Sequence, residues 1–438
     1  MATSIIIIGA GAAGLQAGRR LAAVGHRVIL LEAAAEPGGR ILALTPRGFS
    51  TPVEGGAEFV HGALPLSLGL MKEAGIVLQP VKAEMVRWPG GGDGVASGGA
   101  TATSGSAGDE EGVMRVDWGA LMEAMAGLTE DVPIAAFLAT HFGGERYAQL
   151  RESVRRFAEG YDLADMDRAS TMALYKEWSG EEGEEEWRPV GGYRRMIDWL
   201  VAECRRTGAE LFFSSPVTEV SWEKGRVAAT TAGGRVFTAD TLVVSISLGM
   251  LATGALQWVP ALPELDRAVQ QLGFGSVVKI LLEFRRPFWL DQKPAGRTLF
   301  VLSDQPVPTW WTQTEEESRL LTGWLAGDRM RRFQQLDGAA RLESCLRSVA
   351  AIFSREPEWV RDELVASVIL DWAGAPFIKG GYSFETVGAA RARAILGRPF
   401  GGTLYFCGEA LYEGEAPGTV EAALQSGWDV AEKIIAQS

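Results

Sequence analysis

The apolar residues near the start of the chain follow two alternating patterns, those of a buried strand and of an amphipathic helix. Residues 4–8 form a continuous, mostly β-branched run, which is typical of a strand covered on both faces in a parallel sheet. Apolar residues such as Leu15 and Leu21 then recur at helical spacing until Gly25, which suits a helix end. Residues 27–31 repeat the buried-strand pattern. This order predicts a doubly wound α/β sheet with right-handed crossovers.

The same patterns predict most of the later elements. Helices are expected at 193–204, 339–353 and 420–436, and strands at 211–220, 227–231, 241–247, 277–284, 320–326, 365–371 and 403–406. Residues 116–178 carry apolar residues at helical spacing, so we expect them to form a helical insertion. Residues 88–112 are rich in Gly, Ser, Ala and Thr, which predicts a flexible surface loop.

An acidic run follows the expected helical insertion. It contains Glu181, Glu182, Glu184, Glu185 and Glu186. Runs of like charge are usually solvated, so we expect a surface loop here. Attraction of a cationic substrate is the alternative interpretation.

At 438 residues the chain is too long for one compact core, and two domains are expected. Both are discontinuous, because the nucleotide-type fold opens at the first strand and is completed only by the last strand and helix. We assign 1–80, 189–258 and 386–438 to a Rossmann-like domain. Residues 81–188 and 259–385 form a discontinuous α+β substrate-binding domain that includes the helical insertion.

Composition narrows the class of function. The formal net charge of −13 argues against nucleic acid or an anionic membrane surface as a partner. Three scattered cysteines and three scattered histidines exclude a disulfide framework and predict no metal site. We see neither a signal peptide nor an apolar run of the roughly 20 residues that span a bilayer. We therefore expect a cytoplasmic monomer or homodimer that acts on a small molecule.

A glycine motif stands where the first strand meets the first helix. Gly9 permits a tight turn, Gly11 lets the backbone approach a pyrophosphate, and Gly14 allows the helix to pack closely on the strand. Glu32 follows 18 residues after Gly14, at the end of the second strand, where an acid binds the ribose hydroxyls. The motif predicts an adenosine-diphosphate site, and by itself it does not separate NAD from FAD.

Two further segments favour FAD. Gly38 and Gly39 offer close backbone approach and Arg40 a cation for phosphate, and this spacing resembles that of flavin oxidases of the amine oxidase and glutathione reductase-like superfamily. Near the carboxyl end, a strand runs through Gly408 into Glu409, an acid placed for the ribityl hydroxyls. The rest of the predicted cofactor site is Ala13, Val217 and the helix start Gly418, Thr419 and Val420, which faces the flavin pyrimidine edge.

With these motifs the chain resembles, nearly end to end, the flavin-containing amine oxidase family, which includes monoamine oxidases, polyamine oxidases and lysine-specific histone demethylases. The resemblance also rests on residues 53–62, 277–279, 380–383, 407–409 and 417–427. Its motifs are most similar to those of polyamine oxidases. It implies that the Rossmann-like domain is of the glutathione reductase type and binds FAD.

The resemblance also implies roles for single residues. Lys279 matches the lysine that holds a water near flavin N5, and Trp372 matches a tryptophan that packs near the flavin. His61 matches a histidine over the substrate channel of animal polyamine oxidases. Glu58 lies close to it in sequence and is a candidate substrate residue, although the family fixes no acid at this position.

Three positions depart from the monoamine oxidases of mitochondria. Tyr382 stands where those enzymes have the cysteine that tethers the flavin, so we expect FAD to be bound non-covalently. Ser383 and Thr419 stand where their two substrate-sandwiching tyrosines lie, so that aromatic cage is expected to be missing. We include Tyr382 and Ser383 among the substrate-binding candidates.

The implied reaction is oxidation of a polyamine or monoamine to an imine, which water hydrolyses to a carbonyl product while O2 is reduced to H2O2. An apolar, aromatic pocket would lower the pKa of the amine and favour its reactive neutral form. The alternatives are an L-amino-acid oxidase, a desaturase of lipophilic substrates and a non-enzymatic flavoprotein scaffold. The first needs a cation for the carboxylate and the second an apolar membrane-facing surface, and neither is evident in the sequence.

Overall fold

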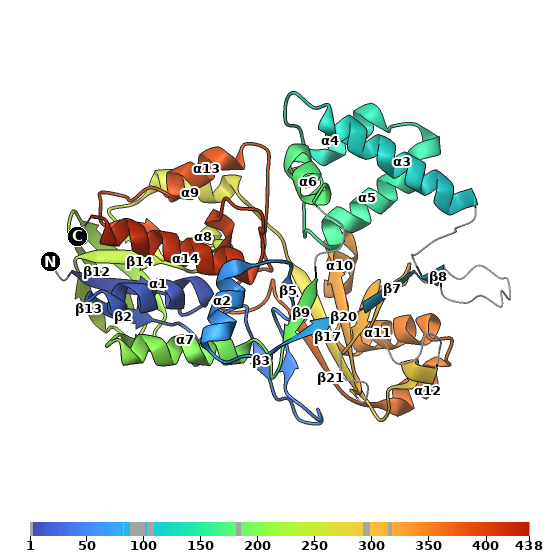
Figure 1. Cartoon of the computed structure of the whole chain (residues 1–438), viewed down its shortest axis with the longest axis horizontal. Helices are drawn as coiled ribbons and strands as arrows, with labels where there is room; N and C mark the ends of the chain where they lie inside the picture. The colour runs from blue at the N-terminus through green and yellow to red at the C-terminus, as the bar shows by residue number, and fades with distance from the viewer. Residues whose placement is uncertain are drawn as a thin grey trace.

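The computed structural model describes residues 3–81, 83–87, 101–102, 109–180, 185–291, 298–313 and 318–437. One part of the molecule is built on a five-stranded sheet (Figure 1). Its strands lie in the order β10 (Glu210–Phe212), β2 (Arg27–Leu31), β1 (Ser4–Ile8), β14 (Thr241–Val244) and β23 (Leu404–Phe406), all parallel. The order reverses between β1 and β14, and doubly wound sheets bind ligands at the carboxyl ends of strands beside such a reversal.

Both faces of this sheet are covered, which explains the continuous apolar runs of its strands. Ile5 and Ile7 pack against helices α1 (Ala12–Ala23), α7 (Arg194–Arg206) and α14 (Val420–Ile435). Ile6 and Ile8 face the other side, since side chains alternate along a strand. That side holds the four-stranded sheet β13 (Val236–Ala239), β12 (Arg226–Thr231), β11 (Val217–Glu223) and β15 (Gln257–Val259), with helices α9 (Pro263–Gln271) and α13 (Ala389–Leu396).

The second part is built on a seven-stranded mixed sheet. Its order is β21 (Leu364–Asp371), β17 (Val277–Phe284), β20 (Leu320–Ala326), β19 (Thr309–Thr312), β18 (Thr298–Leu302), β7 (Ala83–Arg87) and β8 (Thr101–Ala102). Every residue of β17 is buried. Helices α10 (Gly327–Gln334), α11 (Gly338–Ile352) and α12 (Pro357–Glu363) contribute to the core of this sheet.

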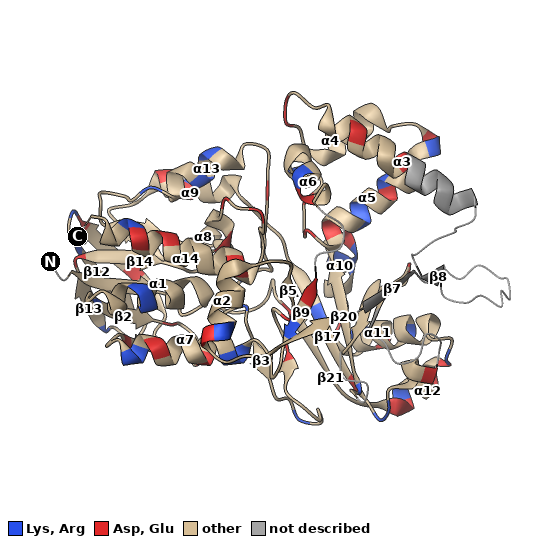
Figure 2. Ribbon diagram, in the orientation of Figure 1, with Lys and Arg blue, Asp and Glu red and all other residues tan. Residues whose placement is uncertain are grey.

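A group of helices lies beside this sheet, at the upper right of Figure 1. It comprises α3 (Asp109–Ala126), α4 (Ile134–His141), α5 (Ala148–Gly160) and α6 (Thr171–Trp178). Leu121, Leu150 and Val154 are buried in its core, as their helical spacing predicts. Acidic and basic residues are interspersed on the peripheral helices, whereas the central strands are mostly uncharged (Figure 2).

Short strands connect the two sheets and carry several candidate site residues. They form the three-stranded sheet β5 (Val60–His61), β9 (Glu186–Pro189), β6 (Leu78–Val81) and the pairs β3 (Ala43–Leu44) with β4 (Val53–Glu54) and β16 (Gly273–Phe274) with β22 (Ser383–Phe384).

Helix α2 (Pro65–Glu73) docks on α14, because the buried Glu421 carboxylate accepts hydrogen bonds from the backbone N–H groups of Leu66 and Ser67. Within the described residues, no helix is long and apolar enough to cross a membrane.

The structure corrects two of the expected elements. The strand predicted at 211–220 is two strands in different sheets, β10 and β11. The chain turns at Ser214, which has a φ of +49°. The backbone N–H groups of Ser214 and Ser215 donate to the carbonyls of Ala34 and Glu32 rather than continuing a strand pairing. Within the predicted loop 88–112, residues 101–102 belong to β8 and 109–112 to α3, while 88–100 and 103–108 lie outside the described residues. Of the acidic run, 181–184 also lie outside, and Glu186 opens strand β9.

Candidate functional site

A single continuous cavity of about 3060 Å³ runs from the five-stranded sheet to the helical group. Pockets for drug-sized ligands are usually about 300–1,000 Å³, so this one has room for a dinucleotide and a substrate together. Except for Gly14, every cofactor, substrate and catalytic residue predicted above lines it. The structure thus brings these residues together, and their individual roles stay predictions.

The glycine motif occupies the reversal point between β1 and β14. Gly9 has a φ of +104°, and a Cβ on Gly14 would lie 2.1 Å from the Gly9 carbonyl oxygen. Gly14 therefore packs the helix on the strand, while Gly9, Gly11 and Ala13 face the cavity. Helix α1 begins at Gly11 without a side-chain cap, which leaves its first N–H groups to a bound anion. These features fit a pyrophosphate.

Glu32 closes the ribose end of this site. Its carboxylate accepts hydrogen bonds from the N–H groups of Ala10 (2.7 Å) and Ala34 (2.8 Å). Burial raises the pKa of Glu32, and these backbone hydrogen bonds oppose that effect. An ionised carboxylate has about four lone-pair positions, so it can still accept two ribose hydroxyls.

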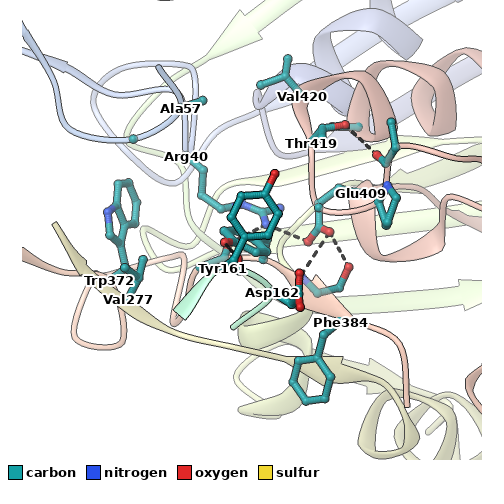
Figure 3. A pocket seen from close by; sticks show the side chains of 18 of the residues that line it. Arg40, Ala57, Tyr161, Asp162, Val277, Trp372, Phe384, Glu409, Thr419 and Val420 are labelled. Carbon is teal, nitrogen blue, oxygen red and sulfur yellow. Dashed lines mark hydrogen bonds and ion pairs between the residues drawn. The ribbon is translucent and has the colours of Figure 1, made fainter. Parts of the chain in front are cut away.

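Arg40 and Glu409 form an ion pair in the middle of the cavity (Figure 3). Arg40 Nη1 donates to Glu409 Oε1 (2.7 Å) and to the Gly381 carbonyl (2.8 Å). Glu409 is only 4% exposed and also accepts from the Ser383 hydroxyl (2.5 Å). Arg40 lies more than 300 residues from both Gly381 and Glu409 in the sequence, so no local pattern predicts these contacts.

The carboxyl-terminal segment presents a helix end to the cavity. Gly408 and Gly418 have φ values of +147° and +69°, a region that favours glycine. Thr419 caps α14: its hydroxyl accepts from the N–H of Ala422 (3.2 Å). The partial positive charge at this helix end suits an electron-rich group, and its contact with the flavin edge stays a prediction.

Lys279 anchors a buried charge cluster in the substrate part of the cavity. Its side chain is 1% exposed, and Nζ donates to the Gly56 carbonyl (3.0 Å) and to Glu58 Oε2 (2.8 Å). Glu58 also accepts from Arg188 Nη2 (2.7 Å) and, at 3.2 Å, from the Trp311 indole N–H. Lys279 is therefore buried and paired rather than exposed to solvent.

The charges around Glu58 decide its protonation. Burial alone would raise the pKa of Glu58, but the nearby charges of Lys279 and Arg188 outweigh it and lower the pKa to about 2. The carboxylate therefore stays ionised and neutralises one of two buried cations. Arg188 and Trp311 were not predicted, because strands β9 and β19 bring them to Glu58 from distant parts of the sequence.

Glu54 lies close enough to this cluster to interact with the charges of Lys279, Glu58 and Arg188, and it makes the stability of the fold depend on pH. Burial raises its pKa from 4.5 to about 7, against a hydrogen bond from the Tyr193 N–H and the charge of Lys279. Because the folded pKa exceeds the unfolded one, ionisation favours unfolding: stability falls as the pH rises from about 4.5 to 7. We expect Glu54→Gln to stabilise the protein at pH 8 by on the order of 2–3 kcal/mol and to leave it unchanged at pH 4, measured by denaturant titration.

The control for this prediction is the exposed Glu130→Gln, which should change stability at neither pH. Equal stability of the Glu54→Gln and parent proteins at pH 8 would show that Glu54 ionises without cost.

Aromatic side chains form a wall beside Lys279. The rings of Trp324 and Tyr382 are stacked with centroids 6.5 Å apart, and the Tyr382 hydroxyl donates to the Tyr161 carbonyl. The buried Trp372 donates its indole N–H to the Gly55 carbonyl (3.2 Å). Ser383 and Thr419 also line the cavity, so its aromatic wall is formed by other residues. Trp324 was missed, because tryptophans are equally common in cores.

His61 stands at a more open part of the cavity. Its side chain is 38% exposed, and Nδ1 lies 2.9 Å from Glu186 Oε1 of the acidic run. Strand pairing of β5 with β9 sets this contact. His61 is thus placed where a substrate can reach it.

Within the described residues, no group of three or more His, Cys, Asp or Glu side chains is arranged to hold a metal ion.

Known proteins share this sequence pattern and fold. A family model for flavin-containing amine oxidoreductases matches residues 12–435. The chain is 26% identical, over 99% of its length, to lysine-specific histone demethylase 1 homolog 2 of Oryza sativa subsp. japonica and 27% identical, also over 99%, to lysine-specific histone demethylase 2 of Homo sapiens. It spans about half the length of these relatives, 57% and 53% respectively.

Solved structures agree on the fold. A putrescine oxidase bound to putrescine matches with a TM-score of 0.81 at 20% identity, covering 100% of this chain and 99% of that chain. Cyclohexylamine oxidase from Brevibacterium oxydans IH-35A matches with a TM-score of 0.79 at 19% identity, with the same coverage. The matching family is flavin-containing, and the glycine turn, the uncapped start of α1 and the α14 helix end fit a dinucleotide, so FAD is the cofactor. The chain belongs to the flavin-containing amine oxidoreductase family.

Proposed function

We propose that this protein oxidises the carbon–nitrogen bond of a polyamine or monoamine and passes the electrons to O2. The main support for this proposal is the buried ammonium of Lys279. It lies beside an aromatic wall, in the same cavity as the cofactor-binding residues. The amine loses two electrons and two protons to become an imine, which water hydrolyses to a carbonyl compound and ammonia or the remaining amine. O2 takes up the two electrons and two protons as H2O2. When bound, FAD supplies the hydride-accepting chemistry.

The protein side chains prepare the amine for this step. Trp324, Tyr382 and Trp372 exclude water, which lowers the pKa of a bound amine and favours the neutral form. Lys279 offers proton donors from a fixed position, because Gly56 and Glu58 hold its ammonium. His61 lies on the more exposed side and is placed to contact the substrate as it enters.

Anaerobic mixing with a panel of amines tests the proposal. The panel contains short monoamines, diamines, longer polyamines and a peptide with an N-methylated lysine. We expect at least one class to bleach the flavin absorbance and admission of air to restore it with formation of H2O2. A flavin that stays oxidised with every amine would refute the proposed function.

The FAD attachment gives a separate prediction. Tyr382 occupies the position of the tethering cysteine, and its hydroxyl is engaged with Tyr161. We therefore expect denaturation followed by ultrafiltration to release all of the flavin into the filtrate. Yellow colour retained on the unfolded chain would show a covalent bond. We keep a cytoplasmic location and a monomeric or homodimeric state as predictions.

A further inference from the structure

His61 and Glu186 face each other on the wall of the cavity. Strands β5 and β9 pair at these two residues, so the backbone holds their side chains next to each other. His61 Nδ1 lies 2.9 Å from Glu186 Oε1. Both residues line the cavity, and their side chains are 38% and 33% exposed. The pair is therefore fixed by the fold and open to a solute.

This hydrogen bond determines which nitrogen of His61 carries a proton. An ionised carboxylate only accepts hydrogen bonds, so Nδ1 donates to Glu186 and Nε2 keeps its lone pair. Among the described residues, no hydrogen bond to Nε2 is found. His26 has the opposite arrangement, because its Nδ1 accepts from the backbone N–H of Thr3 (3.2 Å). His61 thus offers an unoccupied acceptor on the cavity wall.

His61 lies on the way from the open part of the cavity to the Lys279 cluster. The Phe59 ring connects the two places: its centroid is 5.8 Å from that of His61 and 6.0 Å from that of Trp311. Phe59 and Trp311 also line the cavity, and the Trp311 indole N–H donates to Glu58. An amine that passes His61 therefore meets next the aromatic rings beside Lys279.

The charged groups on this side of the cavity come from strand β9 and the acidic run before it. Glu185 is exposed, and its carbonyl accepts from the N–H of Gly62 (3.0 Å). Arg188 lies 4.5 Å from the centroid of Phe59, but its charge is paired with Glu58. Within the described part of the chain, Glu186 is the charged side chain that is hydrogen-bonded to His61.

The proposed oxidation needs a proton acceptor. Alkylamines carry a proton in neutral water, whereas the reacting form of the amine is neutral. The Lys279 ammonium has no lone pair, and the Glu58 carboxylate already accepts from Lys279, Arg188 and Trp311. Imidazole, by contrast, gains and loses protons near neutral pH. His61 is therefore better placed to accept the proton than Lys279 or Glu58.

We propose that His61, oriented by Glu186, removes the proton from the incoming ammonium before the amine is oxidised. This inference rests on the proposed function. One N–H bond of the ammonium breaks, its electron pair stays on the amine nitrogen, and the proton bonds to His61 Nε2. The Glu186 carboxylate then offsets the charge of the imidazolium ion, which releases the proton to solvent from its exposed side. Glu186 is thus a positioning residue that acts through His61.

Anaerobic flavin reduction by two amines tests this proton transfer at pH 8. One is an n-alkylamine; the other is its β,β-difluorinated analogue, a large share of which is neutral because fluorine withdraws electrons. His61→Gln should lower the second-order rate constant of reduction about 100-fold for the alkylamine, the scale of general base catalysis, and less than about 3-fold for the fluorinated amine. Glu186→Gln should act in the same direction.

The tautomer of His61 is measurable without turnover. The chain has three histidines, so ¹⁵N labelling of histidine in the holoenzyme gives few NMR signals. We expect the Nδ1–H form at His61 and the Nε2–H form at His26, and we expect Glu186→Gln to abolish the preference at His61 alone. An Nε2–H form of His61 in the parent protein would contradict the inference whatever the kinetics.

Two control variants separate this role from charge and from general effects. Glu185→Gln removes an exposed charge from the same acidic run, and His141→Gln replaces an exposed histidine that does not line the cavity. Neither should change the rate with either amine. Equal slowing by Glu185→Gln and Glu186→Gln, or equal effects of His61→Gln on both amines, would overturn the inference and leave the proposed function standing. If no amine reduces the flavin of the parent protein, the proposed function itself fails.

Discussion

The Lys279→Met protein is expected to bind FAD normally and to exchange electrons about 100-fold more slowly, or slower still, in at least one half-reaction. The side chain of methionine fills a similar volume, so the fully buried strand β17 keeps its packing. What is lost is the ammonium that Gly56 and Glu58 hold in place. Glu58 retains its bond from Arg188, so the carboxylate is not left without a partner.

Stopped-flow measurements separate the two halves of the reaction. Flavin reduction by amine is followed without oxygen, and reoxidation is followed after rapid mixing of the reduced protein with oxygenated buffer. Lys72→Met, in an exposed position on α2, serves as the control and should match the parent protein in both steps. Parent-like rates for Lys279→Met in both steps would remove this lysine from the mechanism.

Glu58→Gln should be the most destabilising of the substitutions considered. It leaves two neighbouring buried cations, Lys279 and Arg188, without the carboxylate that contacts both. Breaking a buried ion pair by removing one partner costs about 3–5 kcal/mol. Denaturant titration at pH 7 measures this loss, and the exposed Glu219→Gln should change stability by less than about 0.5 kcal/mol.

A double variant and a pH series identify the cause of this loss. Glu58→Gln combined with Lys279→Met removes one of the unpaired cations and should recover part of the stability, giving a favourable coupling energy. The pKa of Glu58 is lowered from 4.5 to about 2, so its contribution is present above about pH 4.5 and is lost as the pH falls towards 2. The Glu58→Gln protein should therefore not show this part of the loss of stability between pH 4.5 and 2. Purely additive effects would mean that Glu58 and Lys279 do not interact energetically.

Local patterns predicted the parts of the fold that depend on neighbouring residues. The strands predicted at 277–284 and 320–326 have the bounds observed for β17 and β20, because continuous apolar runs signal burial on both faces. The glycine motif was equally informative, since its spacing reflects one strand–turn–helix unit. The segment 211–220 was misassigned because the left-handed turn at Ser214 interrupts a pattern that is apolar on both sides.

The site was predicted less completely than the fold. Arg188 and Trp311 reach Glu58 from strands β9 and β19, and Arg40 reaches Glu409 across the whole chain. Such contacts depend on tertiary pairing and leave no periodic trace in the sequence.

The strand order of the five-stranded sheet has a consequence for how the protein is made. Strand β1 is synthesised long before its neighbour β14, which follows more than 200 residues later, and β23 and α14 come later still. The start of α14, which lines the cavity, is thus synthesised after all five strands of this sheet. Because amino-terminal regions begin to fold during synthesis, the early strands and α1 must wait with part of their apolar surface uncovered. The cavity that holds the cofactor-binding residues is therefore complete only after α14 has been synthesised.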